Sequence, residues 1–145
     1  MRAFPLLLLP LIFYNLLAFG GGLVGGAAMA ELLEKGFTLT LPSGDAFPCN
    51  WGLIFITISF GLLFAEIVKA TRTGRGEIMN HALSTLTFVA ALIEFLLLKG
   101  FASGAFFLLT AMCLFDVVAG YTISIITAKR DMTLQGGEYH PCGRE

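Results

Sequence analysis

Four long apolar segments dominate this chain of 145 residues and restrict what it can fold into. Hydrophobic residues make up 57% of the sequence and charged residues only 13%, whereas a soluble domain carries about 25% charged residues. Each segment is close to or above the ~20 residues with which a helix crosses a ~30 Å hydrocarbon core. We therefore predict an all-α membrane protein, in which residues 1–130 form an antiparallel four-helix transmembrane bundle. The expected spans are residues 4–26, 51–70, 79–98 and 101–128.

The basic residues are distributed unevenly around these segments. With four spans, two of the nine lysines and arginines, Lys35 and Lys99, fall on one side of the membrane and seven on the other. Because lysine and arginine are enriched in cytoplasmic loops, both termini are expected in the cytoplasm. The bias suits a bacterial inner membrane, and it explains the basic residues through topology and lipid headgroups, without a nucleic-acid partner. The seven residues are Arg2, Lys69, Arg72, Arg75, Lys129, Arg130 and Arg144.

The first segment also allows a different interpretation. Arg2, followed by an apolar run and by Ala28-Met29-Ala30, resembles a secretory signal peptide with a small-residue cleavage site. Cleavage would leave three spans and an external amino terminus. The apolar run is longer than the core of a typical signal peptide, which favours a first span that is retained.

The connections between the spans are short, except for an outer loop at residues 27–50. Residues Ala27–Lys35 continue the helical pattern, and Phe37–Leu41 then alternates apolar and polar residues before the turn composition Pro42–Asp45. The alternation fits a hairpin over the mouth of the bundle and an irregular loop equally well. The short remaining links favour packing of the last three spans as antiparallel neighbours. Residues 131–145 are expected to form a flexible cytoplasmic tail.

Small residues recur at helical spacing along the apolar segments. Helices associate in a membrane through close packing and hydrogen bonds, because lipid tails are as apolar as leucine. Glycines in the first and fourth spans are therefore expected to face neighbouring helices. Asn50 and Ser103 suit the N-cap positions of the second and fourth spans. The packing glycines are Gly21, Gly22, Gly25, Gly26 and Gly120.

Three acidic residues, Glu66, Glu94 and Asp116, lie within the predicted spans, where a charge needs a partner, a water-filled cavity or a function. Glu66 and Asp116 are each 15 residues from the outer end of their spans, at Trp51 and Phe101. At 1.5 Å per residue this distance is about 22 Å, so both fall in the inner leaflet. Glu94 is only about 7 Å from the outer end of its span.

We interpret Glu66 and Asp116 first as a structural pair. Two carboxylates at one depth are able to share a proton, or to be neutralised by a cation such as Lys69 reaching in from the inner interface. Thr85 or Thr87 is placed to donate a hydrogen bond to either acid. A buried polar clamp of this kind fixes the register of the helices or binds a neighbouring subunit.

A proton or cation relay is the alternative interpretation of the same pair. It would include His81 near the inner interface, together with Asn15 and, nearer the outer interface, Glu94. A transport path needs polar groups across the whole bilayer, and Asn15 and Glu94 supply only part of such a path. The clamp is therefore the favoured interpretation.

No catalytic residue set, cofactor motif or metal-ligand spacing is present in the sequence. Cys49, Cys113 and Cys142 fall in the outer loop, the fourth span and the tail, so an intramolecular disulfide is not expected. His81 is the one histidine near the membrane, which leaves neither a histidine pair for haem nor a recognisable metal site.

The sequence therefore predicts a non-enzymatic protein that contacts the lipid bilayer and binds a protein partner or copies of itself. Its role would be that of an accessory or structural subunit of a membrane complex, or of a homo-oligomer. The alternative is a small proton- or cation-coupled transporter or channel that uses Glu66 and Asp116. An enzyme that acts on lipids or quinones at the inner interface is a more remote third function.

Overall fold

The computed structural model describes residues 4–20, 26–71 and 77–136, and these residues form five helices and one two-stranded sheet. The predicted packing glycines Gly21, Gly22 and Gly25 lie outside the described residues, as do residues 137–145 of the predicted tail. In chain order the elements are α1 (Leu8–Gly20), α2 (Gly26–Glu34), β1 (Gly36–Thr40), β2 (Ala46–Asn50), α3 (Trp51–Ala70), α4 (Glu77–Leu97) and α5 (Gly104–Gly136).

Three helices in the described part of the chain are long and apolar enough to cross a membrane. Their apolar stretches are Trp51–Ala70, Met79–Leu97 and Gly104–Lys129. In length and composition the chain is thus a helical protein suited to several membrane crossings. At 1.5 Å per residue, the 20 residues of α3 cover about 30 Å, the thickness of a hydrocarbon core.

The first apolar segment differs from its predicted span at residues 4–26. Helix α1 has 13 residues, which cover only about 20 Å. The helix begins at Leu8, so Pro10 lies in its first turn, where a missing N–H group costs no helical hydrogen bond. Pro10 is therefore compatible with the helix as it stands. Before the helix, the chain forms turns in which Leu8 N–H donates to the Pro5 carbonyl and Leu9 N–H to the Leu6 carbonyl.

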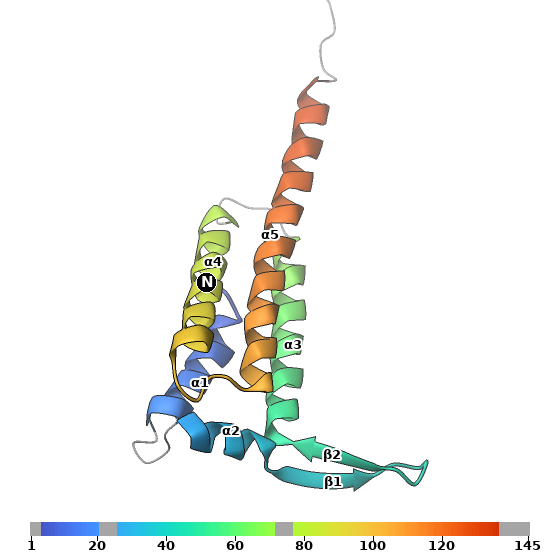
Figure 1. The fold of residues 1–145 in the computed structure, drawn as a ribbon. Coiled ribbons are helices and arrows are strands. Elements are labelled where there is room, and N and C mark those ends of the chain that lie inside the picture. The colour runs from blue at the N-terminus through green and yellow to red at the C-terminus, as the bar shows by residue number, and fades with distance from the viewer. Residues whose placement is uncertain (1–3, 21–25, 72–76, 137–145) are drawn as a thin grey trace, which may run out of the picture.

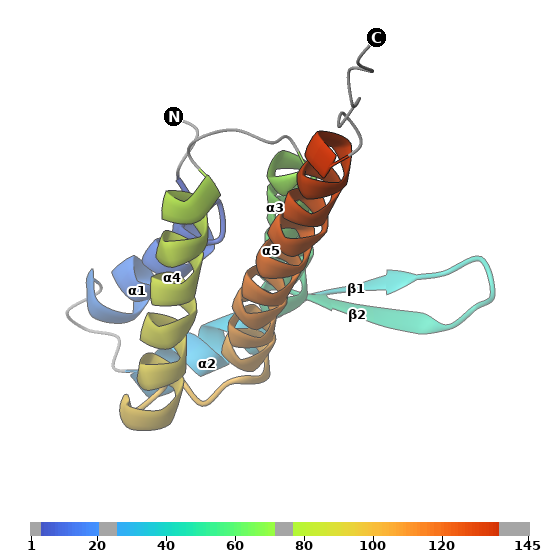
Figure 2. The same cartoon turned by 90° about the horizontal axis from the view of Figure 1, so that it is seen from above.

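The helices α3, α4 and α5 run side by side, with α5 packed against both of the others (Figures 1 and 2). We name the end of this bundle that carries β1 and β2 the hairpin end, and the opposite end the tail end. α4 is antiparallel to α3 and α5, and α1 lies beside α4 (Figure 1). Among the described residues α3 and α4 approach each other little, so the expectation that consecutive spans are neighbours is wrong for this pair. α5 occupies the position beside both helices.

α5 is longer than the other helices and continues to Gly136. Residues 131–136 of the predicted flexible tail are therefore helical. In Figure 1 this part of α5 extends beyond the tail end of α3 and α4.

Strands β1 and β2 form an antiparallel hairpin. The predicted all-α class is therefore wrong in this detail, because the chain also contains a small sheet. The hairpin projects sideways from the bundle and does not cover its mouth, while α2 crosses the hairpin end (Figures 1 and 2). Gly36 is the first residue of β1, where a Cβ atom would lie 2.1 Å from the Cys49 carbonyl oxygen, so only glycine fits this close strand pairing. The predicted N-cap Asn50 is confirmed, because its side chain accepts a hydrogen bond of 2.7 Å from Leu53 N–H.

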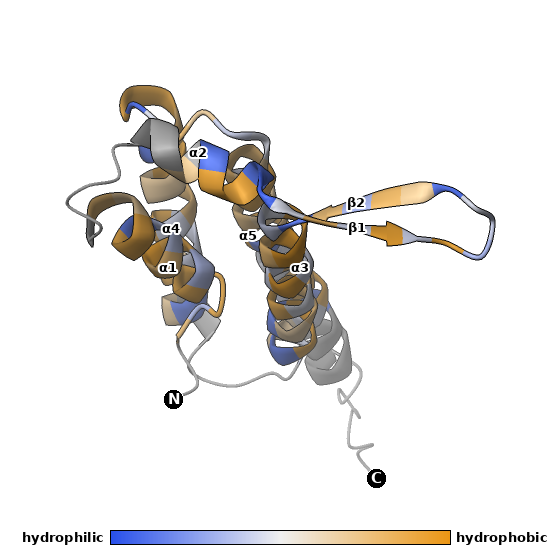
Figure 3. Cartoon of the chain, turned by 90° about the horizontal axis from the view of Figure 1, so that it is seen from below, coloured by the Kyte–Doolittle hydropathy of each residue, from blue (hydrophilic) through white to orange (hydrophobic). Residues whose placement is uncertain are grey.

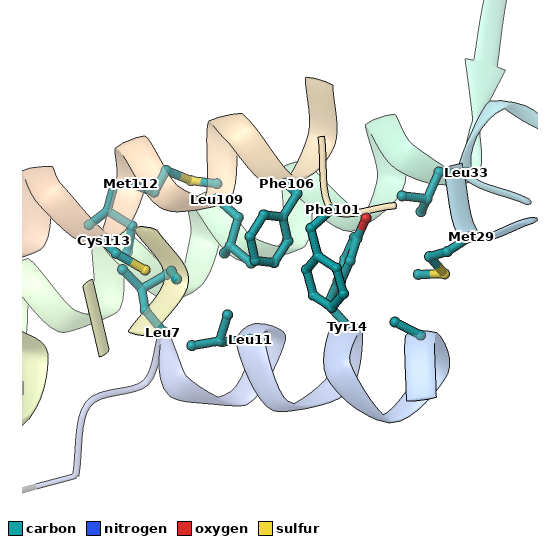
Figure 4. Close-up of a cluster of buried hydrophobic side chains, with 13 residues drawn as sticks. Leu7, Leu11, Tyr14, Met29, Leu33, Phe101, Phe106, Leu109, Met112 and Cys113 are labelled. Atoms are coloured by element: carbon teal, nitrogen blue, oxygen red, sulfur yellow. The ribbon is translucent and has the colours of Figure 1, made fainter. Parts of the chain in front are cut away.

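An aromatic cluster fixes α1 to the start of α5 (Figure 4). The ring of Tyr14 is fully buried, 4.6 Å from the ring of Phe106 and 5.3 Å from that of Phe101, measured between centroids. Its hydroxyl lies 3.2 Å from that of Ser103, which also accepts from Phe106 N–H and so caps α5 as predicted. Tilted ring pairs at these distances stabilise a core beyond the area they bury.

The surfaces of α3, α4 and α5 that face away from this core carry large apolar side chains. Figure 3 shows hydrophobic residues along all three helices. A water-soluble monomer rarely exposes a continuous apolar surface of this extent, which agrees with helices suited to lipid. Examples that are more than 60% exposed are Phe60, Phe64, Leu86, Leu97 and Phe115.

Candidate functional site

The predicted polar residues of the spans gather into two separate groups. The first, which we name the tail-end polar cluster, lies where α3, α4, α5 and the segment before α1 meet. The second is a pair formed by Asn15 and Glu94 between α1 and α4. The tail-end polar cluster consists of Glu66, Lys69, Asn80, His81, Ser84, Asp116 and Ser124.

Glu66 is the centre of the tail-end polar cluster and is 0% exposed. Its carboxylate accepts hydrogen bonds of 2.8 Å from the Asn80 side-chain amide and 2.9 Å from the backbone N–H of Leu6. The Lys69 ammonium, one helical turn further along α3, forms an ion pair with it at 3.1 Å. Three different donors thus surround one buried carboxylate, which satisfies the condition for keeping a charge out of water.

Lys69 connects this network to the amino-terminal segment. Its Nζ atom donates to the Phe4 carbonyl oxygen and, over 3.1 Å, to the Asn80 side-chain oxygen. Both a backbone carbonyl and a backbone N–H of the residues before α1 are therefore bound by side chains of α3. These residues precede α1, so helical hydrogen bonds do not satisfy these two backbone groups.

Asp116 and His81 form the part of the cluster between α4 and α5. Asp116 is buried with the Ser84 hydroxyl as a hydrogen-bonding neighbour, and Glu66, His81 and Lys69 lie close enough to interact with it electrostatically. Asp116 forms no ion pair with any other described residue. Each of the two predicted acids therefore has its own hydrogen-bonding partners, although they are electrostatic neighbours.

The ring of His81 is held in place on α5 by a hydrogen bond and by close packing. Its Nε2 atom lies 2.7 Å from the hydroxyl of Ser124, and the ring centroid is 5.6 Å from that of Tyr121. Gly120 provides the space for the ring, because a Cβ atom there would lie 2.6 Å from Nδ1 of His81. Gly120 thus lies directly against α4, one turn from Asp116.

The Asn15–Glu94 pair lies nearer the hairpin end. The Asn15 side-chain amide donates to the Glu94 carboxylate at 2.8 Å and to the Leu11 carbonyl of its own helix at 3.0 Å. The pair joins α1 to α4. It makes no hydrogen bond to the tail-end polar cluster within the part of the chain that the structure describes.

The hydroxyl side chains located between the tail-end polar cluster and the Asn15–Glu94 pair do not connect the two by hydrogen bonds. Ser59, Thr87 and Thr110 each donate to a carbonyl four residues earlier in their own helix, at 2.8–2.9 Å. Thr85 also donates to its own helix, at the His81 carbonyl. The expectation that Thr85 or Thr87 bonds a buried acid is therefore wrong, because the i−4 carbonyl is the nearer acceptor.

Sequence reasoning missed Asn80 and the backbone of the segment before α1 as partners of Glu66. The i, i+3 spacing of Glu66 and Lys69 was a usable signal, because such residues are neighbours on one helix face. Asn80 at the start of an apolar segment was a weaker signal, since asparagine is also common at helix starts. No sequence pattern marks a backbone N–H as the ligand of a side chain 60 positions away.

The described residues contain no group of three or more His, Cys, Asp or Glu side chains that could hold a metal ion. A groove of about 550 Å³ lies at the hairpin end, between α2, β2 and the first turns of α3 and α5. Leu33, Ile56 and Leu108 give it apolar walls, and Glu34 and Asn50 add polar atoms. No family model matches this chain, and neither a curated protein nor a solved structure shows significant similarity to it.

Proposed function

We propose that this chain is a non-enzymatic integral membrane protein that acts as a structural or accessory subunit, bound to a protein partner or to copies of itself. The observation that carries this proposal is the Glu66 carboxylate, which is buried and bound by Lys69, Asn80 and the backbone N–H of Leu6. A carboxylate with this set of donors holds helices together. It is poorly placed to exchange protons or to bind a substrate.

The physical role of such a network is to fix one arrangement of the helices. Polar side chains within a membrane favour the helix packing in which they are paired, because an unpaired group in hydrocarbon is costly. Glu66 and Lys69 on α3 select one position of α4 through Asn80 and one position of the amino-terminal segment through its backbone. A rigid bundle of this kind presents fixed apolar surfaces to a partner.

The fourth crossing belongs to the same proposal. The segment from Phe4 to Gly20 runs from the level of Glu66 towards the hairpin end, since Leu6 N–H bonds Glu66 and Tyr14 packs on Phe101. We infer that this segment belongs to a fourth crossing, in a four-helix bundle with both termini in the cytoplasm of a bacterium. The uneven distribution of basic residues supports this orientation.

The proposed orientation is tested by labelling intact cells with a membrane-impermeant maleimide. One variant would have Ser43→Cys in the hairpin turn as its sole cysteine, and a matched variant would keep only Cys142. We expect labelling of the first in intact cells and of the second only after the membrane is permeabilised. The reverse order would place the hairpin in the cytoplasm and overturn the orientation.

A proton- or cation-coupled function is the second candidate, and Asp116 is the observation in its favour. This acid is buried beside His81 and has no ion-pair partner among the described residues. The Ser59, Thr87 and Thr110 hydroxyls, which donate within their own helices, do not extend a path from it towards the Asn15–Glu94 pair. The clamp therefore has the stronger support.

Both candidate functions are tested on the protein extracted from its native membrane. We expect a particle heavier than the 15.6 kDa chain by native mass spectrometry in mild detergent, and no proton or sodium flux in proteoliposomes. A strictly monomeric protein without a partner would overturn the subunit proposal. Flux that is lost in Asp116→Asn but kept in Glu94→Gln would establish the transport alternative.

A further inference from the structure

The hairpin of β1 and β2 has one apolar face and one small or polar face. Residues paired across an antiparallel sheet lie on the same face, and successive residues of a strand alternate between faces. The pairs Phe37↔Cys49 and Leu39↔Phe47 therefore share one face, which we name the apolar hairpin face. The opposite face carries the pairs Gly36↔Asn50, Thr38↔Pro48 and Thr40↔Ala46.

Three of the four side chains on the apolar hairpin face are exposed, and the fourth, Cys49, is half-buried. Phe37 is 51% exposed, Leu39 48% and Phe47 41%. The opposite face, through Pro48 and Asn50, lines the groove beside α2 and α5, so the apolar hairpin face is the one turned away from those elements. A two-stranded hairpin is marginally stable in water on its own, and this one needs a covering surface.

The position of the hairpin indicates what that surface is. The hairpin leaves the bundle at the hairpin end of α3, across the direction of the helices, and so lies at the level where a bilayer would end (Figures 1 and 3). Trp51 begins α3 directly after β2 and is 53% exposed, and tryptophan is enriched at membrane interfaces. The apolar hairpin face thus lies at the same end of the bundle as a residue typical of membrane interfaces.

The hairpin offers few features that a protein partner would recognise. Residues 36–50 contain one charged side chain, Asp45 in the turn, so the hairpin offers little for electrostatic recognition. Two backbone hydrogen bonds continue the ladder, from Trp51 N–H to the Lys35 carbonyl and from Leu41 N–H to the Asp45 carbonyl. They show that the odd-numbered residues of β1 form the hydrogen-bonded pairs. Pro48 consequently stands where β2 would donate to an added strand, and because proline cannot donate, it disfavours strand addition at the β2 edge.

We propose that the hairpin lies on the outer surface of the bilayer, with the apolar hairpin face inserted at the boundary between lipid headgroups and acyl chains. Amphipathic segments bound in this way are buried about 5–10 Å into that boundary. The hairpin would widen the contact of a small bundle with one leaflet and resist its tilting or rotation. This inference takes the outer orientation from the proposed function, whereas the depth difference between the two hairpin faces is measured independently of which side the hairpin is on.

The test measures the depth of each face by nitroxide labelling in vesicles of phosphatidylcholine and phosphatidylglycerol. In a Cys113→Ala, Cys142→Ala background, the label is attached to Cys49 on the apolar face. In matched variants that also have Cys49→Ala, it is attached through Leu39→Cys on that face or through Thr38→Cys and Thr40→Cys on the opposite face. Collisions with oxygen and with a water-soluble nickel chelate then report the depth of each label.

We expect the labels at positions 39 and 49 to lie about 5–10 Å deeper than those at 38 and 40. Equal collision with the nickel chelate on both faces would overturn the proposal. Spin–spin broadening between labels at position 49 would also overturn it, because it would show that a second copy covers this face. Unchanged circular dichroism and a single elution volume establish that each variant is folded.

Discussion

Lys69→Met is expected to lower the free energy of unfolding by about 3 kcal/mol, because removing one partner of a buried ion pair leaves an uncompensated charge. Methionine keeps most of the volume of the lysine stem, so the loss reports the ammonium group rather than a cavity. Three contacts disappear together, those with Glu66, Asn80 and the Phe4 carbonyl. Glu66 is fully buried, so its carboxylate would be left without a charged partner.

Reversible unfolding in mixed micelles of increasing SDS content measures this loss. Lys35→Met is the matched control, since Lys35 is an exposed lysine at the hairpin end, and changes of this kind stay within about 0.5 kcal/mol. The double variant Lys69→Met, Glu66→Gln should recover part of the loss, because a neutral amide costs less to bury than an unpaired carboxylate. Equal stability of Lys69→Met and Lys35→Met would show that the network does not clamp the bundle.

The positions of the three long helices were accessible from sequence because the bilayer imposes a simple rule. A backbone that crosses hydrocarbon must satisfy its hydrogen bonds internally, so a long apolar segment has to be helical. The predicted span 51–70 coincides with α3 for this reason. Counting 1.5 Å per residue also placed Glu66 and Asp116 at one depth, and the structure brings them within electrostatic range of each other.

The first segment was less predictable because its structure depends on contacts distant in sequence. Apolar composition alone extended the expected span to residue 26, whereas α1 ends at Gly20 and a separate helix begins at Gly26. The turns before Leu8 are bound by Glu66 and Lys69. Composition describes how a residue interacts with lipid, and it carries no information about which side chain binds a given backbone group.

The hairpin shows the same division between local and tertiary information. Alternation and a turn composition are local properties, and they suggested strands over residues 37–41. The direction in which the hairpin leaves the bundle is set by the α3 junction, where Trp51 N–H bonds the Lys35 carbonyl and Asn50 caps the helix. The local sequence pattern therefore predicts the strands but does not determine whether the hairpin covers the mouth of the bundle.

Gly120→Ala is expected to destabilise the packing of α4 on α5 by about 1–3 kcal/mol, the usual cost of adding a methyl group to a filled site. The new Cβ atom would lie 2.6 Å from Nδ1 and 2.7 Å from Cε1 of the His81 ring. The ring is buried and bonded to Ser124, so it has little freedom to move without losing that bond. The same unfolding measurement in mixed micelles gives the change.

Gly61→Ala on α3 is the matched control, because no heavy atom lies within 4 Å of a Cβ atom there. Alanine is the better helix former by about 1 kcal/mol in water, so this variant should be neutral or slightly more stable. If Gly120→Ala behaved in the same way, the contact between His81 and Gly120 would not contribute to stability.

Two further variants separate the packing contact from the hydrogen bond. Ser124→Ala removes the hydrogen bond to His81 and leaves the ring in its place beside Gly120. His81→Ala removes the ring itself, and with it the atoms that a Cβ atom at position 120 would approach. If close packing is the dominant effect, the His81→Ala, Gly120→Ala double variant should be no less stable than His81→Ala alone, with a coupling energy of about 0.5–3 kcal/mol. Additive losses would instead mean that Gly120 acts through the backbone of α5. Gly120 would then have no part in positioning His81 beside Asp116.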